Sequence, residues 1–283
     1  MSRRLAMLAL AAALVIAKLD YHYSLAFITR PSAHITINNS AHSSISTCRL
    51  GWLDNFLPQK IDNDESDHER RRQYPEQYPA SYELSSIQVA GDTKEVASII
   101  RPLLLQTQLE QRPLSLAYDS SQHGWSPESF HTRVDGKGAA VVVATTKTSK
   151  NQIITVGGYN PKGWASMGGA RPSVAAFVFY QDNGTFQKLR KVGGGGLACG
   201  RDDPNFGISF GPDALVISLQ SGRERLASSK LGPYYERGPD ERSSLFESSN
   251  QAVQLDSIKV YVGNYKPGEE IPYSGAVMDM TSG

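Results

Sequence analysis

Short runs of apolar and β-branched residues dominate the chain from residue 114 onward. Gly, Pro, Asn and Asp separate these runs, which is typical of strands joined by turns. The pattern predicts strands at 114–118, 139–145, 152–156, 174–180, 186–192, 214–219 and 255–262. With few helical segments, it indicates a mainly β protein of the α+β class: a two-sheet antiparallel β-sandwich flanked by helices.

Hydrophobic spacing also predicts one amphipathic helix ahead of these strands. Asp92 and Glu95 stand three residues apart, as in a capping box that uses Asp for the usual Ser or Thr. Pro102 predicts a kink or break, because proline removes a backbone hydrogen bond. The expected buried face recurs at helical spacing and consists of Val96, Ile99, Ile100, Leu103 and Leu104.

The N-terminus has the features of a secretory signal peptide. Arg3 and Arg4 precede an unbroken apolar run, 5–17, whose 13 residues are too few to span a bilayer. Ser24 and Ala26 supply the small residues of a cleavage site, so residues 1–26 are predicted to be removed. A short uncleaved anchor helix is the alternative. We expect no transmembrane span in the mature chain.

Residues 27–53 differ from the start of an ordinary secreted domain. They hold eight Ser or Thr and no acid, a composition typical of transit peptides. A signal peptide followed by Phe27 and such a segment resembles the bipartite leader of plastid proteins in algae with secondary plastids. The resemblance implies import into the plastid (chloroplast). Delivery to the secretory pathway is the alternative.

The rest of the chain divides into three parts. Residues 54–91 carry clustered charges and two Tyr-Pro pairs, which predict a polar lead-in or linker outside the core. Residues 92–263 hold all the predicted elements and form the domain. Residues 264–283 are expected to be a C-terminal tail.

Charge and cysteine content exclude several classes of protein. Lys and Arg number 29 against 28 Asp and Glu, so the chain lacks the positive excess of a nucleic-acid binder. Two cysteines, Cys48 and Cys199, are too few for a disulfide framework or a thiolate metal cage.

Two enzyme-like strings lack the context that their chemistry requires. Gly207-Ile-Ser209-Phe-Gly211 matches G-x-S-x-G, but strand-like residues come after it where a nucleophile elbow needs a helix. We expect a glycine-flanked turn there. Residues 193–198 fit a loose dinucleotide-binding pattern, but residues 199–204 do not start a helix cleanly, which favours a surface loop.

A series of short motifs is informative as a whole, because its members follow one another in a specific order and spacing. Its members are Tyr118, His123, Gly124, Phe130, His131, Asp135, Gly136, Lys137, Gly138, Gly157, Gly158, Tyr159 and Trp164. Their order and spacing resemble the TLDc domain over roughly residues 92–263. The chain departs from that family's pattern at Asp119, where serine is usual, at Val134, where cysteine is common, and at Tyr261, where tryptophan is usual. Residues 221–252 resemble a family-variable insertion.

Part of this motif has a structural role. Its glycines can adopt a positive φ or let two backbones approach closely. Asp135 before Gly136 predicts a tight turn between two strands. Trp125, Phe130 and Trp164 carry large apolar areas and are expected to wedge between the sheets.

The polar motif residues are the candidates for acid–base or nucleophilic chemistry. They are Ser121, His123, His131 and Asp135, with the thiol of Cys199 as a separate candidate. On a helix, His123 and His131 would lie two turns apart, too far to share a metal ion. We expect no metal site and no cofactor. The alternative role for His and Asp is hydrogen bonding within a buried turn.

The TLDc resemblance implies an association with protection against oxidative damage. In animal relatives it also implies binding to the vacuolar proton-pumping ATPase, but it brings no established active site. The sequence thus favours a regulatory or protein-interaction module that is not an enzyme. The alternatives are a thiol-dependent antioxidant built on Cys199, a weak hydrolase, or an accessory subunit of a plastid membrane complex.

Overall fold

Two antiparallel sheets form the body of the protein. The computed structural model describes residues 64–182, 184–192, 201–247 and 252–273, all within one compact unit of the chain, Ile61–Gly283. The larger sheet has the order β1-β10-β2-β3-β4-β5 and the smaller has the order β6-β7-β8-β9. The described strands are β1 (Leu114–Asp119), β2 (Ala140–Lys147), β3 (Ile153–Asn160), β4 (Phe177–Asp182), β5 (Thr185–Arg190), β6 (Ile208–Phe210), β7 (Leu215–Ile217), β8 (Leu226–Ser228), β9 (Val253–Gln254) and β10 (Ser257–Gly263). The predicted class, an antiparallel two-sheet sandwich with few helices, is confirmed.

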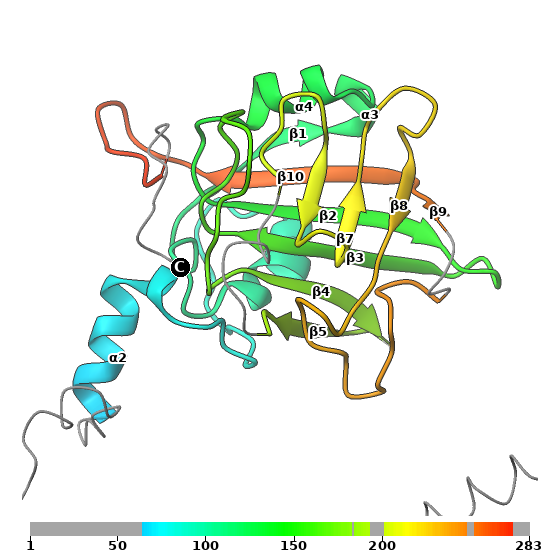
Figure 1. The fold of residues 1–283 in the computed structure, drawn as a ribbon. Coiled ribbons are helices and arrows are strands. Elements are labelled where there is room, and N and C mark those ends of the chain that lie inside the picture. Colours follow the sequence, from blue (N-terminus) through cyan, green and yellow to red (C-terminus); the bar gives the residue numbers. More distant parts are fainter. Residues whose placement is uncertain (1–63, 183, 193–200, 248–251, 274–283) are drawn as a thin grey trace, which may run out of the picture. The chain divides into compact units, whose positions relative to one another are not determined.

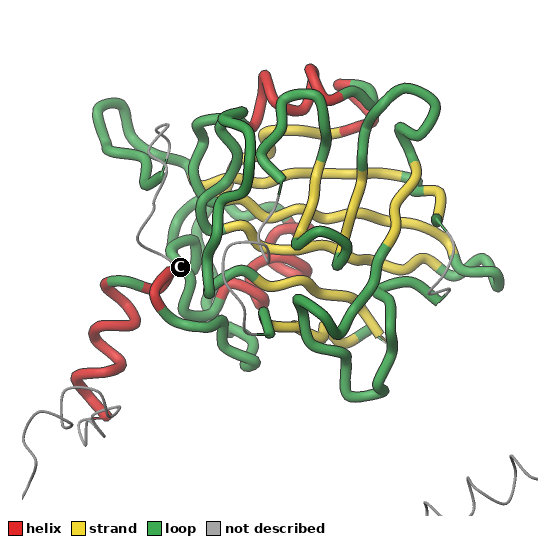
Figure 2. Tube along the Cα trace, in the orientation of Figure 1, coloured by secondary structure: helices red, strands yellow, loops and turns green. Residues whose placement is uncertain are grey.

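The smaller sheet lies across one face of the larger sheet, and short helical segments lie behind the other face and along the β1 edge (Figures 1 and 2). The described helices are α2 (Asp64–Gln73), η1 (Pro75–Gln77), η2 (Val96–Ile100), η3 (Arg101–Leu104), α3 (Ser120–His123) and α4 (Pro127–Val134). Among these, none is both long and apolar enough to cross a membrane.

Strand β2 shows why the larger sheet is apolar on both faces. Ala140, Val142 and Ala144 belong to the core between the two sheets. Val141 and Val143 point to the opposite face, where they join a second core with residues of η2 and η3. Successive side chains of a strand alternate between faces. The sequence of a strand that is covered on both sides is therefore an unbroken hydrophobic run.

Strand β10 joins the two ends of the domain. It lies between β1 and β2 and is antiparallel to both, so that Tyr261 is opposite Leu116 on one side and Val141 on the other. The last strand among the described residues thus lies between the first two strands of the domain.

All seven predicted strands are present with shifted bounds, and three short ones were missed. These are β6, β8 and β9, each of two or three residues. The turn expected at 207–211 is wrong, because β6 passes through Ser209 before the chain turns at Gly211. The stretch 221–252 contains β8 and supplies core side chains. They are Ala227, Leu231, Tyr235, Leu245 and Phe246.

The predicted amphipathic helix is present and is broken at the proline. π-Helical η2 gives way to 3₁₀-helical η3, whose second residue is Pro102. The expected capping box is wrong. The hydroxyl of Thr93 accepts the N–H of Val96 at 3.3 Å, whereas Asp92 and Glu95 form ion pairs with cationic side chains. A charge-assisted contact is stronger than a neutral helix cap.

The described parts of the lead-in and the tail both contact the domain. Ala80 is buried in the second core, so the prediction of a lead-in wholly outside the core is wrong. The guanidinium of Arg112 stacks over the ring of Tyr265 in the tail at 4.1 Å.

Gly157 and Gly158 in β3 confirm the expectation of close approach. A Cβ at Gly157 would lie 1.9 Å from the carbonyl oxygen of Val142, and one at Gly158 would lie 2.7 Å from the ring of Phe210. At these two glycines, neighbouring atoms therefore leave no room for a side chain on either face of the larger sheet.

Arg101 is the buried cation that holds the η2–η3 segment, and we expect its removal to destabilise the domain. Its guanidinium binds both carboxylate oxygens of Asp92 at 2.7 Å and the carbonyl oxygens of Leu109 and Arg112. Arg101→Ala would leave a buried carboxylate without its cation. The free energy of unfolding, measured with urea, should fall by about 3–5 kcal/mol.

Lys259→Ala is the matched control. Lys259 and Glu95 also form a close ion pair, at 2.6 Å, but their side chains are 30% and 34% exposed. This variant should lose about 0–1 kcal/mol. Equal losses in the two variants would contradict a special role for Arg101.

Candidate functional site

The first motif, Tyr118 to Gly124, forms the end of β1 and the short helix α3. The carboxylate of Asp119 accepts the N–H of Ser121 at 2.8 Å and its hydroxyl at 2.6 Å. Nδ1 of His123 accepts the N–H of Asp119 at 3.0 Å. Ser121 thus donates to a carboxylate rather than to His123, and the two do not form a nucleophile–base pair.

The second motif places His131 and Asp135 one turn apart at the end of α4. The hydroxyl of Ser126 begins this helix by accepting the N–H of Ser129 at 3.2 Å. Nδ1 of His131 lies 2.8 Å from Oδ1 of Asp135, and its Nε2 lies 3.0 Å from the carbonyl oxygen of Phe206. The i, i+4 spacing on a helix produces the first contact.

Ser166 and Asp202, which the sequence did not single out, complete this arrangement. The hydroxyl of Ser166 donates to Oδ2 of Asp135 and lies 3.1 Å from Nδ1 of His131. We call His131, Asp135, Ser166 and Asp202 the polar cluster. Ser166 stands two residues after the motif's Trp164, a weak signal. No spacing in the sequence connects Asp202 with the motif.

Asp202 is fixed by the backbone of the loop that carries Ser166. Its carboxylate accepts the N–H groups of Ala165 at 3.0 Å, Ser166 at 2.9 Å and Met167 at 3.2 Å. Its side chain is buried. Ser166 has a φ of 54°, in the left-handed region that non-glycine residues rarely adopt. The three hydrogen bonds hold the loop in this conformation.

Both ring nitrogens of His131 face oxygen acceptors. Burial by itself lowers the pKa of His131. The hydrogen bond and charge of Asp135, the Phe206 carbonyl and the charge of Asp202 together outweigh burial, and the pKa is raised. A protonated ring donates to Asp135 and Phe206 at once. This supports the expected alternative, hydrogen bonding within a buried turn.

The polar cluster does not have the geometry of a Ser-His-Asp triad. In a triad the serine and the acid bind opposite nitrogens of the imidazole. Here Ser166 and Asp135 both lie at Nδ1 of His131, and Nε2 faces a backbone carbonyl. The cluster does bring potential metal ligands together: one ligand atom each from His131, Asp135 and Asp202 lies within 4.8 Å of the others. His123 is not part of that group.

Aromatic rings fill the space beneath the two motifs. Phe130 packs edge-on against Tyr118 at 5.6 Å and Trp164 at 5.3 Å between ring centroids, and Trp164 packs edge-on against Phe210 of β6 at 6.4 Å. The hydroxyl of Tyr118 donates to the carbonyl of Gly124 at 2.6 Å. The expected wedge of Phe130 and Trp164 between the sheets is confirmed, with Trp125 packed at its margin.

The glycine turn after α4 has a different place from the one predicted. Asp135 and Gly136 follow helix α4 and lead into β2, so the prediction of a turn between two strands is wrong. Gly136 has a φ of 70° and Gly138 a φ of 75°. Lys137 between them is exposed. The signal for a tight turn was correct, but the helical nature of 127–134 was not anticipated.

The remaining candidates do not form an active centre in the described residues. Ser209 is buried in β6, where its hydroxyl donates to the carbonyl of Gly211 at 2.6 Å, and a strand rather than a helix comes next. Residues 193–198, for which a surface loop was predicted, and both cysteines, Cys48 and Cys199, lie outside the described residues.

The comparison of the sequence with known families gives one match. The TLDc domain matches residues 92–257, which is more than half of the chain. The chain belongs to the TLDc family. No curated protein sequence matches it significantly.

The three departures from the TLDc pattern are accommodated by the fold. Asp119 caps α3, a role that serine also performs. Val134 is fully buried between the sheets, and Tyr261 is buried on the opposite face. Each replacement suits its surroundings, so the departures do not disturb the motif region.

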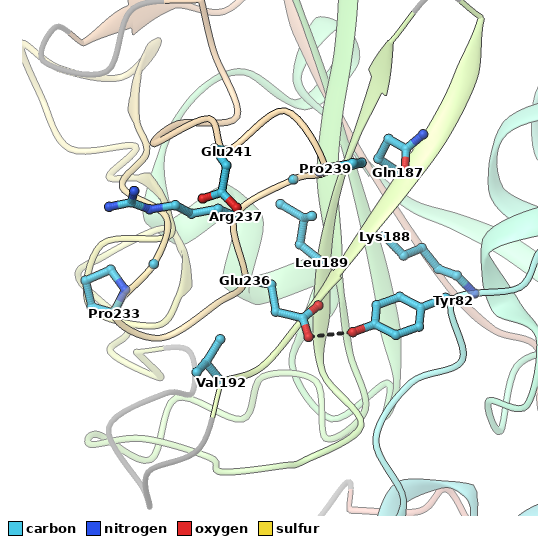
Figure 3. A pocket seen from close by; sticks show the side chains of 12 residues that line it. Tyr82, Gln187, Lys188, Leu189, Val192, Pro233, Glu236, Arg237, Pro239 and Glu241 are labelled. Carbon is cyan, nitrogen blue, oxygen red and sulfur yellow. Dashed lines mark hydrogen bonds between the residues drawn. The ribbon is translucent and has the colours of Figure 1, made fainter. Parts of the chain in front are cut away.

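The TLDc domain also has a groove beside strand β5 (Figure 3). The groove has a volume of about 920 Å³ and is lined by β5 and by the segment 232–241. The hydroxyl of Tyr82 donates to Glu236 across it at 2.6 Å. Tyr82 and Val192, which both line the groove, are 54% and 43% exposed. It thus offers apolar side chains beside charged ones.

Strand β5 is an edge strand with a partly covered edge. Glu236 N–H donates to the carbonyl of Arg190, and Val192 N–H donates to that of Tyr234. Peptide groups alternate in direction along an antiparallel strand, so the N–H and C=O of Lys188 also point away from β4. In the part of the chain that the structure describes, the outer backbone hydrogen bonds of this edge begin only at Arg190.

Lys188 in the groove makes the stability of the domain depend on pH. Burial lowers its pKa to about 8, and its Nζ donates to the carbonyls of Glu83 and Leu103. A lysine in the unfolded chain titrates near 10.4. Between these two values the unfolded state binds more protons, so the free energy of unfolding rises with pH.

The wild type should therefore gain stability relative to Lys188→Met as the pH rises from 7 to 10.5. The gain should be up to about 3 kcal/mol. Urea denaturation of both proteins at several pH values measures it, and groups that titrate in both proteins cancel in the difference. A difference that stays constant over this range would contradict the lowered pKa.

Proposed function

We propose that this TLDc domain is a regulatory protein-interaction module that protects against oxidative damage and is not an enzyme. Membership of the TLDc family supports the link to oxidative stress. The groove at the β5 edge supports the interaction, because it combines outward peptide groups with exposed apolar side chains.

The hydrogen bonding of the motif supports the non-enzymatic part of the proposal. Ser121 and His123 each bind Asp119, and Ser166 and Asp135 share one nitrogen of His131. A nucleophile needs a base that accepts its proton. In both pairs the hydroxyl donates to a carboxylate, and neither serine has an imidazole positioned as its base as in a catalytic triad.

The proposed partner binds as an extended segment along β5. Such a segment could continue the ladder at Lys188, as in strand addition to an exposed sheet edge. Its apolar side chains would lie against Tyr82 and Val192, both on the groove. Recognition through main-chain groups and a few side-chain pockets suits a module without a reaction of its own.

Val192→Arg should remove most of this binding. A buried unpaired charge at an interface costs several kcal/mol, so capture of the partner should fall about tenfold or more. The measurement is quantitative mass spectrometry of proteins cross-linked to the full-length chain in its own cells. Leu116→Arg is the matched control: Leu116 is 42% exposed, on β1 at the opposite edge of the same sheet. Equal capture by both variants and the wild type would contradict the groove as the binding site.

Turnover would contradict the non-enzymatic role. The purified full-length chain is tested on a panel of esters and peroxides, which covers both a weak hydrolase and a thiol-dependent antioxidant at Cys199. We expect no activity that depends on His123 or on Cys199. Activity that His123→Ala abolishes without loss of the fold would replace the interaction module with an enzyme.

The location that we propose is the plastid, reached through a signal peptide and a transit segment. The support is compositional: the apolar run 5–17, the acid-free segment 27–53 and the aromatic residue Phe27 at their junction. The partner would then be a plastid protein, such as a subunit of a membrane complex.

Phe27→Ala should leave a fluorescent reporter fused to residues 1–53 in the secretory route. The wild-type leader should bring the reporter into the plastid. A longer fusion of residues 1–60 with Phe56→Ala serves as the control, because it also loses an aromatic side chain. Unchanged plastid import of Phe27→Ala would remove Phe27 from the argument. Retention of the wild-type fusion in the secretory route would refute the plastid location.

A further inference from the structure

We propose that the polar cluster is a binding site for one divalent transition-metal ion, with Mn²⁺ and Zn²⁺ as its best-fitting ions. The ligands would be Nδ1 of His131, carboxylate oxygens of Asp135 and Asp202, and the hydroxyl of Ser166. This replaces the sequence-based expectation of no metal site, and it is independent of the partner at the groove.

The donor atoms already converge. The ligand atoms of His131, Asp135 and Asp202 lie within 4.8 Å of one another. The hydroxyl of Ser166 adds a fourth donor, in contact with Asp135 and 3.1 Å from Nδ1 of His131. Metal–ligand bonds of about 2.0–2.2 Å place neighbouring ligands some 3 Å apart. Small movements of side chains would therefore suffice to close the site.

The tautomer of His131 is set by the backbone. Its Nε2 lies 3.0 Å from the carbonyl of Phe206, an acceptor only, so this nitrogen carries the proton. In the neutral ring the lone pair is then on Nδ1, which faces the two carboxylates. Histidine ligands in metal sites characteristically donate their other N–H to a carbonyl or carboxylate.

Asp202 is oriented in the same way. Three backbone N–H groups of residues 165–167 hold its buried carboxylate. Oδ1 accepts two of these N–H groups and Oδ2 accepts one, so one lone pair remains on Oδ2, since an ionised carboxylate offers about four acceptor sites. The ligands come from the end of α4 and from two separate loops, and the hydrogen bonds around them fix their direction before any ion binds.

The charge balance leaves room for a cation. Asp135 and Asp202 bring two negative charges, and Arg171 is close enough to interact with both carboxylates. One negative charge remains, so the cluster attracts cations, and a bound divalent ion would change this net charge to +1.

The donor set selects the kind of ion. One imidazole with two carboxylates and a hydroxyl is harder than the thiolate sites of structural zinc and softer than the all-oxygen sites of Ca²⁺ and Mg²⁺. Mn²⁺ and Zn²⁺ accept such mixed ligands. The side chain of Asp135 is 23% exposed, so an ion can reach the cluster from solvent on that side.

Mn²⁺ binding can be measured directly by electron paramagnetic resonance. The full-length chain, without an affinity tag and treated with a chelator, is titrated with Mn²⁺, and the six-line signal of the free ion gives the bound fraction. We expect saturation at one tight Mn²⁺ per chain and competition by Zn²⁺. At an ion concentration a hundred times the Kd, the thermal midpoint should rise by roughly 5–10 °C.

Asp135→Asn should weaken this binding about tenfold or more, since it removes a ligand charge without changing the shape of the side chain. Asp240→Asn is the matched control, because Asp240 is an exposed acid paired with Arg242. Equal affinities of the wild type and Asp135→Asn, or the absence of a saturable site, would overturn the proposal.

The wild type alone provides a second readout if Asp135→Asn does not fold. Spin-echo modulation from a nitrogen bound directly to Mn²⁺ would identify His131 as a ligand, and it should disappear in His131→Gln. Tight Mn²⁺ binding without nitrogen modulation would place the ion elsewhere and would also overturn the proposal.

Discussion

Burial of the larger sheet on both faces is the constraint on which the rest of the structure depends. A strand such as β2 cannot face water on either side, so the domain needs a cover on each face. The smaller sheet covers one face. The η2–η3 segment and the lead-in cover the other, and Arg101 and Lys188 fasten them through carbonyl oxygens. Segments without regular structure are therefore part of the fold rather than attachments to it.

The same constraint determines where polar chemistry can occur. Both faces of the sheet are occupied by apolar packing, which leaves its edges and the ends of its strands for polar groups. Helices α3 and α4, which carry His123 and His131, run along the β1 edge, and the groove lies at the β5 edge. These helices and the groove are thus at opposite edges of the larger sheet.

Much of the fold could be predicted because the relevant signals are local. Runs such as 139–145 carry strand propensity and two-sided burial within a few residues, and Pro102 marks a helix break by itself. The strands β6, β8 and β9 were missed because two or three residues are too few for a period. Helix α4 was missed because its first turn reads as a loop, although Ser126 and Pro127 are a good helix start.

The polar cluster could be predicted only in part. His131 and Asp135 are neighbours on a helix, so their contact follows from spacing. Asp202 reaches them through folding of a distant loop, and nothing in its local sequence marks it. Its three hydrogen bonds to residues 165–167 exist only once that loop has closed. Contacts of this kind depend on tertiary structure and have no periodic signature.

The composition of the polar cluster is not explained by stability. A buried ion pair is often no better for stability than apolar side chains of similar volume, because removing charges from water is costly. The neighbouring positions are filled by Phe130, Val134 and Trp164, which pack efficiently. Apolar side chains could hold the loop without the desolvation cost of a histidine, two carboxylates and a hydroxyl directed at one point. A proton on His131 balances the charge but leaves the remaining lone pair on Oδ2 of Asp202 unused. A bound cation would use all four side chains, and it would join α4 to both loops with bonds stronger than those of the hydrogen-bonded form.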